Sequence, residues 1–361
     1  MTNMIPNLST LHSNLTARRF VERSRAELEQ VGQELSTGYK ADIAKDLGMQ
    51  SSQAIAFRNA MDKTEGYITG NKVLESKLSL LSGTMDNFRN EAQSMMDLAV
   101  TNASSPAPTV DALQAEAKAT LDALTSHLNV NYNGEYLFAG IDANSTPVQS
   151  YSETNNETGY SPQGVVEGIV GTNIASPADA ATKIAELDAI FDSSNTVNPD
   201  RNFEGTFFKG MPLEDAGGNP NKRINAIVAD DQKIEYGKQA NDPAFTEILK
   251  GVSMIAGLDP AEIDNAAGYD AWMNEAINSM ASGIKKLGVE QADIGKKRES
   301  LDEIITQQED KKGIYNNRIV ALEGVDHYEA ASRMSALETQ LEATYSVTAK
   351  ISQLSFLNFM G

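Results

Sequence analysis

The sequence predicts a mainly α-helical protein, in which long N- and C-terminal helices pair in a coiled-coil or bundle rod beside a small central α+β or β-rich domain. Apolar residues recur every 3.5 residues on average over residues 273–322, and again over 74–99. This spacing forms the seam of a left-handed supercoil, which needs a partner helix to bury it. Eight of the eleven prolines lie from Pro147 to Pro260 and none follows, so irregular structure is expected in the middle.

The two ends of the chain each predict an amphipathic helix, over residues 9–35 and 328–357, set apart by Gly38 and Gly324. A unit of two such helices has little core of its own, so we expect it to be loose in the monomer and to order on assembly. The predicted assembly interface consists of Leu8, Leu11, Leu15, Leu28, Val31, Leu35, Leu337, Leu341, Tyr345, Ile351, Leu354 and Leu357.

The rod is predicted from a long helix over 51–103, a break at 104–108, a return helix over 110–128 capped by Thr109, and a helix that opens at Asp242-Pro243. The long C-terminal helix then carries the seam of 273–322. Such seams fit the internal core of a helical bundle as well as they fit an intersubunit contact. The predicted rod core consists of Leu74, Leu78, Leu81, Met85, Phe88, Met95, Ile277, Met280, Ile284, Leu287, Ile294, Leu301 and Ile305.

In the middle of the chain, the helical spacing of apolar residues gives way to turn and strand signals. The Asn133-Gly134 turn and a short strand at 136–140 predict a β-hairpin. Further strands are predicted at 165–170, 206–209, 224–229 and 233–236, with one helix at 179–190. The predicted domains are terminal helices (1–45 and 325–361), a rod (46–144 and 243–324) and an outward-facing variable domain (145–242).

The composition excludes several classes of protein. A formal charge of -20 disfavours binding to nucleic acid and to anionic membranes. There is no cysteine, so disulfides and thiolate metal sites are excluded. Charged residues such as Arg18, Arg19 and Arg23 interrupt any apolar signal core near the start. We therefore expect a chain that is cytoplasmic or exported with its N-terminus uncleaved.

Catalytic chemistry is weakly indicated. His12, His127 and His327 lie on different predicted helices and do not group into a metal site by spacing. An enzyme with its site around Asp230, Asp231 and Glu235 is the less favoured alternative, since adjacent carboxylates in a turn are usually solvated. We predict no catalytic residue, no cofactor and no metal.

Several short motifs occur in a characteristic order. They are the opening at 8–19, the segment 34–40 (ELSTGYK) followed by 44–46, the segment 133–140 (NGEYLFAG), the pair 236–237 followed by 240–245, and the segment 337–345 (LETQLEATY). Together they resemble the flagellin superfamily over the first ~140 and last ~120 residues. Within it, Tyr39-Lys40 and the ending at 354–358 differ from filament flagellins and resemble the hook–filament junction proteins.

The resemblance implies a structural subunit of the bacterial flagellum that forms an adaptor layer between hook-side proteins and the filament. Its expected partners are copies of itself in a ring, a hook-side junction protein, flagellin and a cytoplasmic export chaperone at the C-terminus. It implies unfolded export by the flagellar type III apparatus to the cell exterior. A filament-forming flagellin is the main alternative, and a secreted coiled-coil protein that inserts into membranes is disfavoured by the charge.

Overall fold

A computed structural model describes residues 5–103, 110–171, 173–259, 263 and 265–360, with side chains from residue 12 to 350 except 13 and 14. The chain divides into two compact units, Met1–Gly66 with Gln307–Gly361 and Tyr67–Thr306. The predicted fold class is confirmed, because long helices dominate both ends and the middle holds two short antiparallel sheets.

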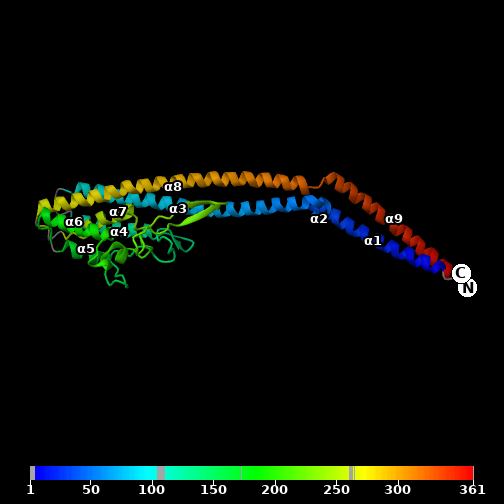
Figure 1. Ribbon diagram of the computed structural model, residues 1–361, viewed down its shortest axis with the longest axis horizontal. Coiled ribbons are helices and arrows are strands. Elements are labelled where there is room, and N and C mark those ends of the chain that lie inside the picture. The colour runs from blue at the N-terminus through cyan, green and yellow to red at the C-terminus, as the bar shows by residue number, and fades with distance from the viewer. Residues whose placement is uncertain (1–4, 104–109, 172, 260–262, 264, 361) are drawn as a thin grey trace. The chain divides into compact units, whose positions relative to one another are not determined.

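The first unit joins the two ends of the chain. Helices α1 (Ile5–Thr37) and α9 (His327–Met360) lie side by side in opposite directions (Figure 1). Helix α2 (Ile43–Leu47) and a 3₁₀ turn (Gly48–Gln50) lead into α3 (Ser51–Thr101). The first part of α3 packs on the last part of α8 (Ala266–Glu323), where the rings of Phe57 and Tyr315 lie 6.2 Å apart. The terminal helices thus start and end a few residues beyond their predicted bounds.

The two sequence seams lie on the inner faces of α3 and α8. On α3, all eight seam residues from Leu74 to Ala99 are buried. On α8, none of the fifteen seam positions from Met273 to Leu322 is exposed, although four of them are polar. On a straight helix of 3.6 residues per turn, a 3.5-residue stripe drifts by about 20° per heptad, so it stays covered along its length only where the paired helices supercoil left-handedly.

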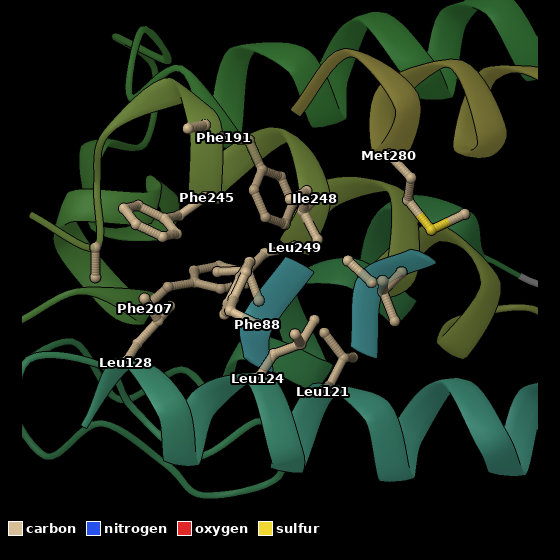
Figure 2. Packing of buried hydrophobic residues seen from close by; sticks show 14 of the residues in the cluster. Phe88, Leu121, Leu124, Leu128, Phe191, Phe207, Phe245, Ile248, Leu249 and Met280 are labelled. Carbon is tan, nitrogen blue, oxygen red and sulfur yellow. The ribbon is translucent and has the colours of Figure 1, made fainter. Parts of the chain in front are cut away.

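Aromatic rings hold the core of the second unit together. Helices α4 (Val110–Leu128) and α7 (Pro243–Ala256) pack against each other, and Phe245 of α7 meets Phe88 of α3 edge to face at 5.2 Å. Phe138 meets the same ring at 5.3 Å. Figure 2 shows Phe88 between Leu124 of α4 and the side chains of α7. The N-cap predicted at Thr109 lies outside the described residues.

Helices α7 and α8 approach each other closely at two glycines. A Cβ atom on Gly283 of α8 would lie 2.9 Å from the backbone nitrogen of Ile248, and one on Gly251 of α7 would lie 2.5 Å from the carbonyl oxygen of Ala276. Neither distance is compatible with a side chain, so only glycine allows this approach. The indole nitrogen of Trp272, on α8, donates to the carbonyl of Met254 at 2.9 Å and fixes the same pair of helices.

The described residues 131–171 and 173–242 contain two hairpins and two short α-helices. Strands β1 (Asn131–Tyr132) and β2 (Glu135–Tyr136) pair around the Asn133-Gly134 turn. Strands β3 (Asn225–Ala229) and β4 (Gln232–Glu235) form the second hairpin, as the sequence predicts for 224–229 and 233–236. Helix α6 (Pro177–Phe191) covers the helix predicted at 179–190.

Three strand predictions are wrong. Residues 165–170 belong to helix α5 (Pro162–Val170), which begins where the Ser161 hydroxyl accepts from the amide of Gly164 at 3.0 Å and ends at Gly171. Residues 206–209 overlap one π-helical turn (Phe203–Phe207), after which Phe208 bridges Val148. Of residues 136–140, only the first lies in a strand, and Ala139 makes an isolated bridge to Gln239. Tertiary packing of apolar side chains overrides local strand preference at all three places.

The central segment shares its core with the helices. Phe191, Phe203 and Phe208 belong to the same buried cluster as Phe88 and Met280. Within the described residues, the segment 145–242 therefore packs on α3, α4, α7 and α8 through one continuous core.

Candidate assembly surface

The α1–α9 pair has a narrow buried inner face. Val31 and Leu341 are buried there, 1 % and 7 % exposed. The guanidinium of Arg25 lies over the ring of Tyr345, 5.6 Å from its centre. Such contacts hold two helices in register but bury little apolar area, because a pair of helices has only one shared face.

The outer faces of the same pair leave large apolar side chains in solvent. Leu15 is 48 % exposed, and Phe20, Tyr345 and Val347 are also exposed. A groove of about 690 Å³ runs between the two helices, with Ala17, Phe20 and Val347 on its walls. Scattered exposed apolar residues are ordinary, but several along one groove mark an interaction surface.

The structure divides the predicted interface residues into three groups. Val31 and Leu341 are buried within the pair, and Leu28, Leu35 and Leu337 are half-buried. Leu15 and Tyr345 are exposed. The remaining five side chains lie outside the described residues: Leu8, Leu11, Ile351, Leu354 and Leu357. Assignment of this set to an interface between subunits stays a prediction.

The predicted rod-core residues face inward. Ile277 and Ile284 are half-buried and the other eleven are buried. At a polar seam position, Gln291 of α8 accepts from Arg89 at 3.0 Å and donates to Asp86 at 2.8 Å, both on α3. Polar residues that find partners within a seam fix the register of two helices. Lys312 serves similarly in the first unit, with its ammonium 2.9 Å from Glu65.

A clamp missed by the sequence reasoning joins the ends of α1 and α8. The amide of Lys40 donates to the carbonyl of Glu323 at 2.8 Å, and the amide of Val325 donates to the carbonyl of Gly38 at 3.0 Å. These two bonds form an antiparallel bridge between Tyr39 and Gly324. Gly324 has no room for a Cβ atom, which would collide with the carbonyl of Val320.

The carboxylate of Glu323 is the electrostatic centre of this clamp, a name we use for residues 38–40, 58 and 322–325. Its side chain is fully buried, and Arg58 Nε donates to its two oxygens at 2.9 and 3.1 Å. The hydrogen bond to Glu323 raises the pKa of Arg58, which keeps the guanidinium charged. Lys40 Nζ adds a bond to the carbonyl of Leu322 at 3.2 Å. In the sequence, the only sign of this clamp was a glutamate at the end of a predicted helix.

The residues of the enzyme alternative lie on an exposed hairpin. Asp230 and Asp231 form the turn between β3 and β4, and Glu235 ends β4 in solvent. The hydroxyl of Tyr67 donates to Asp230 Oδ1 at 2.8 Å, so this carboxylate ties the hairpin to α3. Asp231 has a φ of 59°, as the second residue of a tight turn.

The described part of the chain gives no sign of metal or membrane chemistry. Its histidine, aspartate and glutamate side chains include no group of three placed to hold a metal ion. Its helices likewise include no segment with the length and apolar character needed to span a bilayer.

Two family models match the chain. Residues 8–143 match the bacterial flagellin N-terminal helical region, and residues 273–360 match the bacterial flagellin C-terminal helical region. The chain is 22 % identical to Flagellin B of Vibrio anguillarum, with 97 % of each chain covered.

Solved structures are similar at lower identity. A putative flagellar hook-associated protein from Vibrio parahaemolyticus has a TM-score of 0.50 and 14 % identity, over 76 % of this chain and 98 % of that one. FlgL of Bacillus cereus has a TM-score of 0.38 and 13 % identity, over 75 % and 99 %. The similarity to the Vibrio parahaemolyticus structure concerns the fold alone. The similarity to the Bacillus cereus structure is too weak to support a conclusion about the fold.

Proposed function

The chain belongs to the flagellin family of structural proteins of the bacterial flagellum, and we propose that it acts as hook-associated protein 3, the adaptor layer between hook-side proteins and the filament. The observation that carries the proposal is the α1–α9 pair, which buries its inner face, leaves Phe20 and Val347 in solvent along one groove, and exposes Leu15 on α1. Burial of such side chains stabilises association by about 25 cal/mol for each Å² removed from water.

Assembly is the proposed source of order at the two ends of the chain. The α1–α9 pair has a small core of its own, so its helices gain most from neighbours that cover the groove. We infer that copies of the chain supply these neighbours within a ring. The terminal segments 1–45 and 325–361 would form the inner layer, the rod 46–144 with 243–324 the next, and 145–242 would face outward.

The remaining partners and the route of export follow from the same role. A hook-side junction protein would contact one edge of the ring, and flagellin the other. A cytoplasmic chaperone would cover the apolar C-terminus before unfolded export by the flagellar type III apparatus. The location is then extracellular, on the flagellum, and the role is structural rather than enzymatic.

A filament-forming flagellin is the second candidate. The similarity to a protein named Flagellin B over nearly the whole chain favours it. Against it stand Tyr39-Lys40 in the clamp region and the sequence of residues 354–358, which differ from the filament pattern. The two roles differ in extent of assembly, since an adaptor forms one short layer and a filament subunit polymerises over a long distance.

Immunogold electron microscopy of intact flagella tests the proposal, with antibody raised to residues 145–242. One cluster of label where hook meets filament is the expected result. Label along the whole filament would establish the flagellin role instead, and absence of label from flagella would overturn both. Antibody that has been pre-incubated with the purified chain is the control for specificity, and it should give no label.

A further inference from the structure

The tip of the β1–β2 hairpin carries the single Asn-Gly pair of the chain, Asn133-Gly134. Both residues are exposed. Both have a positive φ, 54° for Asn133 and 92° for Gly134, as a two-residue turn of type I′ requires. A Cβ atom at Gly134 would meet nothing within 4 Å. The turn is therefore open to solvent, where water and base reach it.

An asparagine followed by glycine is reactive in water. The backbone nitrogen of the glycine can attack the side-chain carbonyl carbon of the asparagine, because glycine has no Cβ atom to hinder the approach. The new C–N bond closes a succinimide ring, the side-chain nitrogen leaves as ammonia, and the proton of the attacking N–H passes to water or base. Water then opens the ring at either carbonyl, which gives aspartate or isoaspartate. The net reaction is hydrolysis of one amide and involves no oxidant or reductant.

The folded hairpin holds the attacking nitrogen in a hydrogen bond. The amide of Gly134 donates to Asn131 Oδ1 at 2.8 Å. The attack requires this N–H to lose its proton and to turn toward the side chain of Asn133, and both changes break the bond at a cost in free energy. Asn131 is exposed at the start of β1, so its side chain serves the turn and not the core.

Strand pairing keeps Asn131 beside this amide. Asn131 faces Tyr136 and Tyr132 faces Glu135 across the hairpin. Because this register fixes both arms of the turn, the carbonyl of the Asn131 side chain stays within reach of the Gly134 amide. In an unfolded chain the pairing is lost, and the hydrogen bond is lost with it.

Deamidation at the tip would act on the contact between the hairpin and α3. Lys77 of α3 forms an ion pair with Glu135, and its Nζ lies 5.9 Å from the centre of the Tyr132 ring. A carboxylate at position 133 would stand next to Glu135 and compete for the same ammonium. Isoaspartate would also lengthen the backbone of the turn by one carbon, which a two-residue turn with this register does not accommodate.

We propose that Asn133 is a modification site that deamidates without an enzyme, and that Asn131 is a positioning residue that protects it in the folded chain. The reaction is slow while the hairpin is paired and fast when the turn opens. Water is the only co-reactant. The modification depends on the hairpin alone and not on the flagellar role.

Timed incubation of the full chain at mildly alkaline pH tests the proposal, in buffer and in guanidinium chloride. Mass spectrometry of chymotryptic peptides that contain Asn133 detects the gain of about 1 Da when OH replaces NH₂. Deamidation in denaturant is expected, with a rate in buffer at least about fivefold lower. Equal rates in the two conditions would overturn the protection, and absence of product in denaturant would overturn the site.

Three variants assign the protection to one side chain. Asn131→Ala should deamidate about fivefold faster than the parent in buffer, the effect of losing one hydrogen bond, and at the parent's rate in denaturant. Asn131→Asp keeps an acceptor oxygen and should be as slow as the parent. Asn144→Ala, the same change at an exposed asparagine outside the turn, should leave the rate unchanged. An unchanged rate in Asn131→Ala would show that turn geometry alone protects Asn133.

Hydrogen exchange separates loss of the bond from loss of the hairpin. In Asn131→Ala the amide of Gly134 should exchange faster, whereas the amide of Leu137, which donates to the carbonyl of Val130 at 3.1 Å, should stay protected. If both amides lose protection, the hairpin has opened and Asn131→Asp decides the question. Fast deamidation of Asn131→Asp with Leu137 still protected would overturn the role of Asn131.

Discussion

Arg58 and Glu323 form an ion pair between α3 and α8, although 265 positions separate them in the sequence. The carboxylate is fully buried, whereas the arginine side chain is 43 % exposed. The pair lies beside the two backbone bonds that join Lys40 to Glu323 and Val325 to Gly38. One buried charge thus fixes the point at which both terminal helices leave the rod helices.

Arg58→Gln should open the clamp, because it leaves the carboxylate of Glu323 buried without its cation. Removal of one partner of a buried pair costs about 3 kcal/mol, or roughly a hundredfold in an opening equilibrium. Hydrogen exchange at the amides of Lys40 and Val325 measures it directly, with faster exchange expected at both. Arg318→Gln is the control, since Arg318 is exposed on α8, the helix that carries Glu323, and has the same charge as Arg58. Unchanged exchange in Arg58→Gln would show that the backbone bonds hold the clamp alone.

Leu15→Ala should weaken assembly without changing the isolated chain, because Leu15 is exposed on α1. Loss of the buried contact in the assembly would cost about 1–2 kcal/mol per subunit, or roughly tenfold in incorporation. Competitive incorporation of tagged variant and parent into flagella measures this ratio. Val289→Ala, an exposed apolar change on α8, should incorporate normally. Equal incorporation of Leu15→Ala and its parent would remove Leu15 from the interface.

Leu341→Ala should act differently, because Leu341 is buried between α1 and α9. Its truncation removes core contacts of the pair itself, at a cost of about 2–5 kcal/mol. Faster hydrogen exchange along α9 of the isolated chain is therefore expected, together with weaker incorporation. Normal protection of α9 in the variant would show that the side chain acts only after assembly. The core of the second unit should stay protected in either case.

Gly283→Ala should destabilise the second unit by about 1–3 kcal/mol through overpacking. The added methyl would lie 2.6 Å from Ile248 Cγ1 and 3.0 Å from the carbonyl oxygen of Ala244. Gly288→Ala is the matched control, since nothing lies within 4 Å of a Cβ atom there. In that control the better helix propensity of alanine should stabilise by roughly 0.5–1 kcal/mol. Chemical denaturation of both variants gives the comparison, and the same sign for both would contradict the close approach of α7 and α8.

Tyr151→Phe should stabilise the protein by about 1 kcal/mol at neutral pH. The Tyr151 hydroxyl is buried and has no hydrogen-bond partner among the described residues. Its removal therefore abolishes a desolvation cost that no hydrogen bond offsets. Tyr269→Phe is the contrast, because that hydroxyl donates to the carbonyl of Asn102 at 3.0 Å and its loss should destabilise by about 1 kcal/mol. Thermal unfolding of both at pH 7 measures the difference. Destabilisation by Tyr151→Phe would mean that a water or a side chain satisfies the hydroxyl.

The same tyrosine predicts a dependence on alkaline pH. Burial raises the pKa of Tyr151 above the value of about 10 in the unfolded chain. The folded state therefore holds its proton more tightly, and the stability contributed is fully present below pH 10 and is lost as pH rises from there toward the folded pKa. Tyr151→Phe should make the fall in unfolding free energy above pH 10 less steep. An unchanged slope would assign the loss to other groups such as Tyr236, whose pKa burial also raises.

Regular periodicity made most of the helical framework predictable. The 3.5-residue stripe from Met273 to Leu322 identifies a buried face without knowledge of its partner, because helix geometry alone fixes which side chains share that face. The hairpin of β3 and β4 was also predictable, since alternating residues flank a two-residue turn at Asp230-Asp231. Residues 165–170 were not, because a short run of apolar residues fits either a buried strand or a buried helix.

The amino-acid sequence by itself determined that both ends are long helices with apolar seams, that the middle is irregular, and that the chain carries the N- and C-terminal helical regions of the flagellin family. These properties depend on local geometry and on order along the chain. Only the tertiary structure decided that Arg58 meets Glu323 and that Leu341 is covered while Leu15 is not. Each of these relationships depends on how far apart two helices lie and how each is rotated about its axis. Packing of the whole core sets this distance and this rotation for elements that are distant in sequence.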